Sequence, residues 1–160
     1  MTHEISYVVG DATAPQGEGP KIIAHVCNDA GGWGKGFVLP LARRWPQTRT
    51  AYKTWYRDRD SSGFALGAVQ FVPAEDGLLV ANMIGQHGYR PGGTPPVRYE
   101  AISAALAIVA DRALELRASV HMPRIGCGLA GGRWDLVEPL IAATLTRCGV
   151  PVTVYDVRTA

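Results

Sequence analysis

Residues 118–134 read ASVHMPRIGCGLAGGRW, and the succession of residue types in this stretch decides the fold. An apolar run at 118–122 predicts a buried strand, and a periodic pattern over 134–147 predicts a helix. The loop between them contains four glycines. Glycines at a strand-to-helix junction let the backbone approach a ligand and turn its N–H groups toward it. Because the helix N-terminus adds positive potential, the loop predicts a cradle for a phosphate.

The loop matches neither of two widespread phosphate-binding signatures. No Gly-Lys-Ser/Thr closes it, and its glycines lack the GxGxxG spacing. On this loop alone, a glycine-rich connection without a ligand stays open as the alternative. A second cluster, AGGWGKGF at 30–37, also follows a strand-like run and precedes a helix. Ligands of open α/β sheets bind where such loops converge, so the pair predicts two walls of one cleft that suits a pyrophosphate joining two sugars.

The composition indicates a globular protein with no targeting signal. The 160 residues fit one domain, 1–160, with 47% hydrophobic and 19% charged residues. A net charge of +2 is too small to indicate nucleic-acid binding by charge alone. Three cysteines without a CxxC pair predict neither a disulfide framework nor a metal site. Without a signal peptide or a membrane-length apolar run, we expect a cytoplasmic protein with no membrane contact. We further expect a monomer that uses no metal and no cofactor.

Hydrophobic periodicity predicts ten regular elements. The turn chemistry of PAEDG at 73–77 predicts an antiparallel pair on either side of it, whereas the remaining strands alternate with helices. This order predicts a three-layer α/β/α sandwich around a mixed, largely parallel sheet. The expected strands are 4–9, 21–26, 67–72, 78–84, 119–122 and 151–155, and the expected helices are 37–44, 48–59, 98–117 and 134–147.

Four short motifs occur in a fixed order: GDAT at 10–13, IAHVCN at 23–28, GKGF at 34–37 and MPRIGCGL at 122–129. Together they resemble the macrodomain, a module that binds ADP-ribose, and within it the branch of terminal ADP-ribose protein glycohydrolases and DNA ADP-ribosyl glycohydrolase antitoxins. The resemblance covers nearly the whole chain. It implies that the partners are ADP-ribose and ADP-ribosylated protein or DNA. The preference for Arg over Lys, with abundant Ala and Gly, indicates a bacterial protein.

The resemblance assigns binding roles by position. Asp11 matches the carboxylate that accepts a hydrogen bond from the adenine amine, although Asp is also a common turn residue. Asn28 matches an amide near the distal ribose, and Lys35 lies in the first loop, where a solvated lysine is the alternative. The implied ligand-binding residues are Asp11, Ala12, Asn28, Gly34, Lys35, Gly36, Phe37, Ile125, Gly126, Cys127, Gly128, Leu129 and Ala130.

The catalytic positions of the family differ in this chain. Ester-cleaving members of the branch use a lysine after the fourth strand and an aspartate after Gly-Cys-Gly-Leu, where this chain has Gln86 and Ala130. Neither residue can form the covalent lysine adduct. The remaining catalytic candidates are His87, Gln86 and Asn28; His87 fits a general base at neutral pH, with an exposed bystander histidine as the alternative.

Three functions follow from the resemblance and stay open on the sequence. The first is hydrolysis of ADP-ribose from a modified macromolecule, either ester-linked to Glu or Asp of protein or base-linked on DNA, without a lysine adduct. The second is a non-catalytic ADP-ribose reader. The third is hydrolysis of small ADP-ribose metabolites.

Two histidines, one cysteine and one tryptophan are further candidates for functional roles. His25 and His121 lie on apolar strands and are predicted to be hydrogen-bonded core histidines. We interpret Cys127 as a small residue in a tight loop rather than a nucleophile. Trp33 is a candidate for stacking on a ligand or partner.

Overall fold

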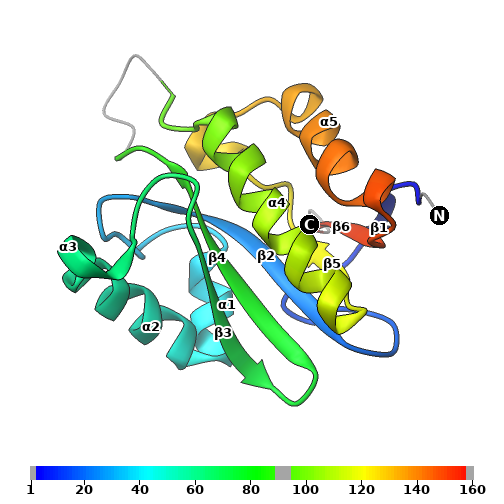
Figure 1. Cartoon of the computed structure of the whole chain (residues 1–160), viewed down its shortest axis with the longest axis horizontal. Helices are drawn as coiled ribbons and strands as arrows, with labels where there is room; N and C mark the ends of the chain where they lie inside the picture. Colours follow the sequence, from blue (N-terminus) through cyan, green and yellow to red (C-terminus); the bar gives the residue numbers. More distant parts are fainter. Residues whose placement is uncertain (1–2, 89–94, 158–160) are drawn as a thin grey trace.

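The computed structural model describes residues 3–88 and 95–157, and a six-stranded sheet forms its centre (Figure 1). The strand order is β1-β6-β5-β2-β4-β3, and all neighbouring strands are parallel except β3 and β4, which are antiparallel. This confirms the predicted mixed, largely parallel sheet. The strands are β1 (Ser6–Val9), β2 (Lys21–Asn28), β3 (Val69–Glu75), β4 (Leu78–Gln86), β5 (Ser119–Met122) and β6 (Val152–Asp156).

Helices cover both faces of the sheet and complete the predicted three layers (Figure 1). Helices α4 and α5 pack on one face, and α1 and α2 pack on the other. No helix in the described part of the chain is long and apolar enough to cross a membrane. The helices are α1 (Val38–Arg44), α2 (Pro46–Arg57), α3 (Arg59–Ser62), α4 (Tyr99–Leu116) and α5 (Trp134–Thr144), with 3-10 turns at Gly128–Ala130 and Thr146–Cys148.

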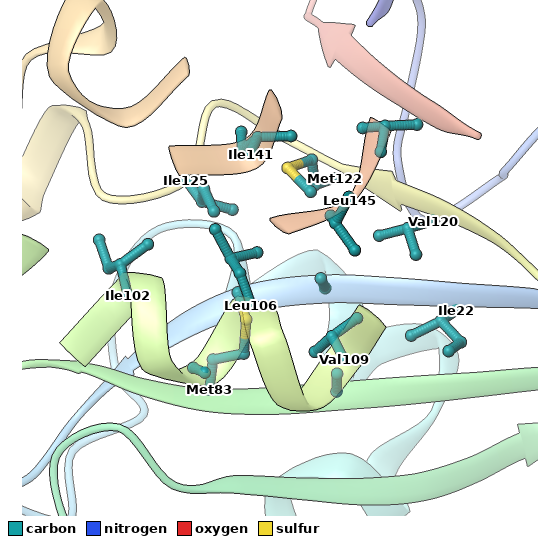
Figure 2. Close-up of a cluster of buried hydrophobic side chains, with 14 of the residues drawn as sticks. Ile22, Met83, Ile102, Leu106, Val109, Val120, Met122, Ile125, Ile141 and Leu145 are labelled. Carbon is teal, nitrogen blue, oxygen red and sulfur yellow. The ribbon is translucent and has the colours of Figure 1, made fainter. Parts of the chain in front are cut away.

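The larger core lies between the sheet and helices α4 and α5 (Figure 2). Leu106 and Val109 of α4 and Ile141 of α5 are fully buried against Ile22 of β2 and Val120 of β5. Full burial of one such aliphatic side chain contributes about 1.5–3 kcal/mol. The central position of β2 and β5 is therefore held by side chains as well as by the backbone ladder.

The helical region after the first glycine loop differs from the prediction at both ends of its second helix. The prediction used Pro46 only as the stop of α1. In the structure Pro46 is also the first residue of α2, because proline is well suited to the first position of a helix. The predicted single helix at 48–59 is wrong at its C-terminal end, where the helix stops at Arg57 and a separate turn, α3, follows.

Five strands run in the same direction, so their carboxyl ends share one edge of the sheet. These ends are Val9, Asn28, Gln86, Met122 and Asp156. Because β2 pairs directly with β5 and with β4, the two glycine loops and the segment after Gln86 leave neighbouring strands at this edge. Asn28 lies opposite Gln86, whereas β5 ends one residue past the pairing of Ile23 with His121.

The buried histidines behave as the sequence predicted. The His25 Nε2 lies 2.5 Å from Asn82 Oδ1, and the Asn82 amide nitrogen donates to Gln70 Oε1 at 3.0 Å. The ring nitrogens of His121 lie 2.7 Å from the hydroxyls of Ser119 and Tyr155. Burial lowers the pKa of His25 to about 4, so its ring is neutral at neutral pH.

The low pKa of His25 predicts acid sensitivity. Its pKa is lower in the folded chain than the ordinary 6.5, so protons bind the unfolded chain first as the pH falls. The stabilisation is complete above pH 6.5 and is lost toward pH 4; His25 alone should remove about 2 kcal/mol of unfolding free energy by pH 5. Urea unfolding followed by tryptophan fluorescence at pH 7 and pH 5 measures this loss. In His25→Gln the loss should be smaller by that amount, and an identical pH dependence in both proteins would contradict the assignment.

Candidate functional site

The first glycine loop is organised by Asn28, the last residue of β2. The Asn28 Oδ1 accepts hydrogen bonds from the backbone N–H groups of Ala30, at 2.9 Å, and Gly32, at 3.0 Å. Its Nδ2 donates to the Gly32 carbonyl at 3.0 Å, and the Tyr52 hydroxyl of α2 donates to the Asn28 carbonyl at 2.7 Å. The amide predicted to meet a ligand is therefore engaged in fixing the loop, which gives Asn28 a positioning role.

A cleft of about 600 Å³ lies along this loop. The carboxyl ends of β2 and β4 form its floor, loop residues 32–35 form one side, and α2 contributes Arg49 and Lys53. Lys35 supplies a third cation, and none of the described lining residues is acidic. The cleft is thus electropositive and suits an anionic ligand. Among the predicted binding residues, it contains Asn28, Gly34 and Lys35.

Sequence reasoning missed the contribution of α2. Arg49 and Lys53 are four residues apart, so they share one face of the helix. Lys53 also donates a hydrogen bond to the Gly31 carbonyl, which ties α2 to the glycine loop. The spacing signals a common face, but only the packing of α2 beside the first loop shows that this face borders a cleft.

The second glycine loop closes on itself. The Gly132 N–H donates to the Gly126 carbonyl at 2.8 Å, and the Val97 N–H donates to the Ala130 carbonyl at 3.1 Å. A Cβ on Gly132 would lie 2.1 Å from the Gly126 oxygen, so only glycine fits there. Gly128 is exposed, with φ +69° and no atom within 4 Å of the position a Cβ would take. The loop therefore presents an open backbone at this point.

The two glycine loops are neighbours at the sheet edge, but the second adds no residue to the described lining of the 600 Å³ cleft. We expected both glycine loops to line one cleft, but only the first loop lines this cavity. Ile125 and Ala130 are buried in the core, as is Ala12 at the other end of the edge, which leaves their backbones for any ligand contact. Phe37 packs partly buried against the α1–α2 core.

His87 is paired with a carboxylate that the sequence did not single out. Its Nδ1 lies 2.7 Å from Asp29 Oδ2, and the Gly88 N–H donates to Asp29 Oδ1 at 2.7 Å. Because the carboxylate accepts, Nδ1 carries the proton and Nε2 is free to accept one. The His87 side chain is 62% exposed and Asp29 only 20%. The Gln86 amide, which lines the cleft, donates to the Gly88 carbonyl at 2.9 Å.

Asp11 occupies the turn after β1. Its Oδ1 accepts hydrogen bonds from the Thr13 N–H at 2.8 Å and the Thr13 hydroxyl at 2.7 Å. The turn role that the sequence allowed is therefore present. The Asp11 side chain lies at the exposed edge, beside the end of β6, because the Gly10 N–H donates to the Asp156 carbonyl at 2.9 Å.

Arg124 links this end of the edge to the second glycine loop. Its guanidinium bonds both carboxylate oxygens of Asp156, at 2.6 and 2.9 Å. It also lies 5.2 Å from the ring centroid of Tyr7 and 5.0 Å from that of Trp134. A two-point ion pair flanked by two rings fixes where the loop leaves β5.

Neither cysteine near the site is suited to nucleophilic attack. Burial raises the pKa of Cys27 far above its usual range and also raises the pKa of Cys127. The thiolate is the reactive form, so both side chains act as small neutral groups at neutral pH, as predicted for Cys127. Within 3–88 and 95–157, no three His, Cys, Asp or Glu side chains are placed to hold a metal ion.

Trp33 is not a stacking platform, and that hypothesis is wrong. Its side chain is 5% exposed and packs edge-on against His25 and tilted against Tyr52, with ring centroids 5.6 and 5.3 Å apart. Its Nε1 is buried and has no hydrogen-bond partner in the described part of the chain, although the residue lines the cleft.

Three solved structures share this fold along nearly their whole length. A macrodomain protein from Streptomyces coelicolor is 66% identical, with 96% of this chain and 99% of that chain covered and a TM-score of 0.87. A protein of unknown function from Bacteroides thetaiotaomicron is 55% identical, with 96% and 98% covered and a TM-score of 0.91. The macrodomain of Mycobacterium tuberculosis DarG is 25% identical, with 96% and 97% covered and a TM-score of 0.78.

Some of the curated relatives are much longer proteins. The chromodomain-helicase-DNA-binding protein 1-like of Mus musculus is 33% identical over 94% of this chain, but the match spans only 17% of that protein. A DNA ADP-ribosyl transferase-DNA ADP-ribosyl glycohydrolase fusion protein of Thermosipho africanus is 43% identical over 37 residues, which are 23% of this chain and 10% of that protein. No protein-family model matches the chain.

The closed second loop predicts a sharp difference between two glycines. Gly132→Ala should lower the free energy of unfolding by about 1–3 kcal/mol, because its methyl group collides with the Gly126 carbonyl. Gly34→Ala is the matched control; no atom lies within 4 Å of the new methyl, so its effect should stay within about 0.5 kcal/mol. Urea unfolding of both variants measures the difference, and equal stabilities would contradict the loop geometry.

Proposed function

The chain belongs to the macrodomain family, and from this premise we propose that it binds ADP-ribose and hydrolyses the bond between the distal ribose and a modified macromolecule. The linkage is an ester to Glu or Asp of a protein or a glycosidic bond to a DNA base. The observation that carries the proposal is the electropositive cleft along the first glycine loop, with the second glycine loop on the adjacent strand. Cations and open backbone N–H groups are the partners that a diphosphate needs.

The strand order supports one orientation of the ligand. Asp11 follows β1 at one border of the sheet, the glycine loops follow β5 and β2 in its middle, and Gln86 ends β4 beyond them. Adenine at Asp11 and the diphosphate at the two glycine loops then direct the distal ribose toward Gln86 and the α2 side of the cleft. The free oxygen of Asp11 remains an acceptor for the adenine amine, since the Thr13 contacts use only Oδ1.

The proposed chemistry uses a water molecule in place of a covalent lysine. The Gln86 amide is held by the Gly88 carbonyl, and the Ala130 side chain is an inert methyl group in the core. His87, oriented by Asp29, accepts the proton of a water through Nε2 as that water attacks C1 of the distal ribose. The bond from C1 to the attached oxygen or nitrogen breaks, and the leaving group keeps the electron pair. In this proposal, the cleft also orients the water, and this orientation further lowers the activation barrier.

A non-catalytic reader is the second candidate. It is favoured by the same two positions, Gln86 and Ala130, where the ester-cleaving members have a lysine and an aspartate. A hydrolase of small ADP-ribose metabolites would use the same cleft. Turnover of ester-linked protein, base-linked DNA and small metabolites by the purified protein distinguishes these possibilities, because the reader cleaves none of them.

Binding should depend on both ends of the ligand. ADP-ribose should bind far more tightly than AMP, and Asp11→Ala should weaken ADP-ribose by roughly tenfold to a hundredfold, since a hydrogen bond to a charged acceptor contributes about 1.5–3 kcal/mol. Calorimetry with Asp76→Ala, an exposed turn residue, as the control measures this effect. Equal loss of affinity for an analogue with guanine would show that Asp11 acts only through its turn.

Hydrolysis should depend on His87 more than binding does. His87→Ala should lower kcat roughly a hundredfold or more at unchanged affinity for ADP-ribose, because the base acts only as the water attacks. Asp29→Asn should lower kcat less, since the imidazole stays but loses its charged partner. Single-turnover kinetics with calorimetry measures both, and a His87→Ala enzyme of unchanged rate would assign the chemistry to the loops alone.

Borohydride trapping during turnover tests for a covalent intermediate. Substrate and borohydride should leave the mass of the protein unchanged while product forms, as no lysine occupies the family position. A trapped adduct on Lys35 would overturn the water mechanism.

A further inference from the structure

Residues 95–99 form a strap along the end of β4. The His87 N–H donates to the Pro96 carbonyl of the strap at 2.8 Å. The Arg98 N–H donates to the Gly85 carbonyl of β4 at 2.9 Å. The strap runs antiparallel to the last residues of β4 and leads directly into α4. The backbone of His87, the proposed base, is therefore tied to the strap.

The opposite border of the strap is joined to the second glycine loop. The Val97 N–H donates to the Ala130 carbonyl at 3.1 Å. The Tyr99 hydroxyl accepts a hydrogen bond from the Arg133 N–H at 3.0 Å, where the loop meets α5. The Val97 side chain is buried, and a Cβ on Gly126 would lie 3.3 Å from its Cγ2. The strap thus contacts this loop through backbone and side chains alike.

The side chain of Arg98 stiffens the strap from within. Its Nη1 donates to the Pro95 carbonyl and to the Val97 carbonyl, both at 2.9 Å. Hydrogen bonds from a charged donor are stronger than neutral ones. Both acceptors belong to the strap, so the guanidinium fixes the shape of this segment just before α4 begins at Tyr99.

Two elements therefore hold His87 from different sides. Asp29 holds the imidazole Nδ1 at 2.7 Å and adjoins Asn28, which organises the first glycine loop. The strap holds the backbone of His87 and is itself held by the second glycine loop. A displacement of a catalytic group by about 1 Å can cost roughly a hundredfold in rate. The strap is thus placed to keep the base in register with both loops.

We propose that Arg98 and Tyr99 are positioning residues for hydrolysis, which act through the strap to hold His87 in place relative to the second glycine loop. The inference rests on the proposed function, because it takes His87 as the base and this loop as part of the diphosphate site. In this role neither side chain contacts the reacting atoms. Their loss therefore lowers the rate of hydrolysis and leaves the affinity for ADP-ribose nearly unchanged.

The first test separates rate from affinity. Tyr99→Phe removes the accepting hydroxyl and keeps the ring, and Arg98→Met removes the donors and keeps an unbranched side chain. Each should lower kcat roughly tenfold, while calorimetry gives an affinity for ADP-ribose within about twofold of wild type. Arg98→Lys retains a charged donor and should recover part of the rate. Arg112→Met, which breaks an exposed ion pair with Glu115 further along α4, is the control and should keep the wild-type rate.

A double-mutant cycle distinguishes positioning from a general structural effect. In a His87→Ala background, Tyr99→Phe should cause no further loss of rate, because the strap then has no base to hold. A merely structural role would lower the residual rate by the same factor as in the wild-type background. Such additive effects would overturn the proposal, as would a wild-type kcat in both Tyr99→Phe and Arg98→Met.

A second readout does not depend on turnover. The His87 N–H is protected by its bond to Pro96, so NMR should show faster amide hydrogen exchange at His87 in Tyr99→Phe and in Arg98→Met. The amide of Ala24, in the middle of β2, should keep its exchange rate. Unchanged exchange at His87 in both variants would overturn the strap. A wild-type protein that cleaves no ADP-ribose linkage would refute the proposed hydrolysis, and with it the kinetic role, whereas exchange would still decide whether the strap holds His87.

Discussion

The parallel pairing of β2 with both β4 and β5 is the constraint on which the site depends. Ile22 aligns with Leu79 on one side and with Val120 on the other, and a bulge at Cys27 and Asn28 brings Asn28 opposite Gln86. Parallel strands have their carboxyl ends at a common edge, so three loops far apart in the sequence leave neighbouring strands at that edge. Without this register, Asp29 could not reach His87, and the two glycine loops would not be neighbours.

The local features of the fold were predictable because glycine, proline and periodic apolar residues determine the backbone conformation of the few residues around them. The glycines at 126, 128, 131 and 132 predicted a loop between a strand and a helix, and the structure has this loop, with positive φ at three of the four glycines. The apolar runs located every strand. The start of α2 at Pro46 was missed because proline both ends one helix and begins another, and sequence alone favours the first interpretation.

The site was less predictable than the fold because its polar groups meet only through tertiary packing. Asp29 and His87 are 58 positions apart, and only the register that pairs Asn28 with Gln86 makes them adjacent. Applied to the sequence, that register would have pointed to Asp29. The spacing of Arg49 and Lys53 indicated that they share a helix face, but it could not indicate that this face borders the cleft. Trp33 was misjudged because exposure of a tryptophan depends on whether neighbours such as Tyr52 cover it.

Burial divides the titratable groups near the site into those available for chemistry and those that hold the structure. His25 and His121 stay neutral inside the sheet layers, and the buried thiol of Cys27 keeps its proton. The exposed imidazole of His87 keeps one nitrogen free while Asp29 holds the other. The proposed water-based reaction uses this imidazole as its base, because no nucleophilic lysine occupies the family position. In the same proposal, the cations of the cleft act through charge alone and attract the anionic ligand.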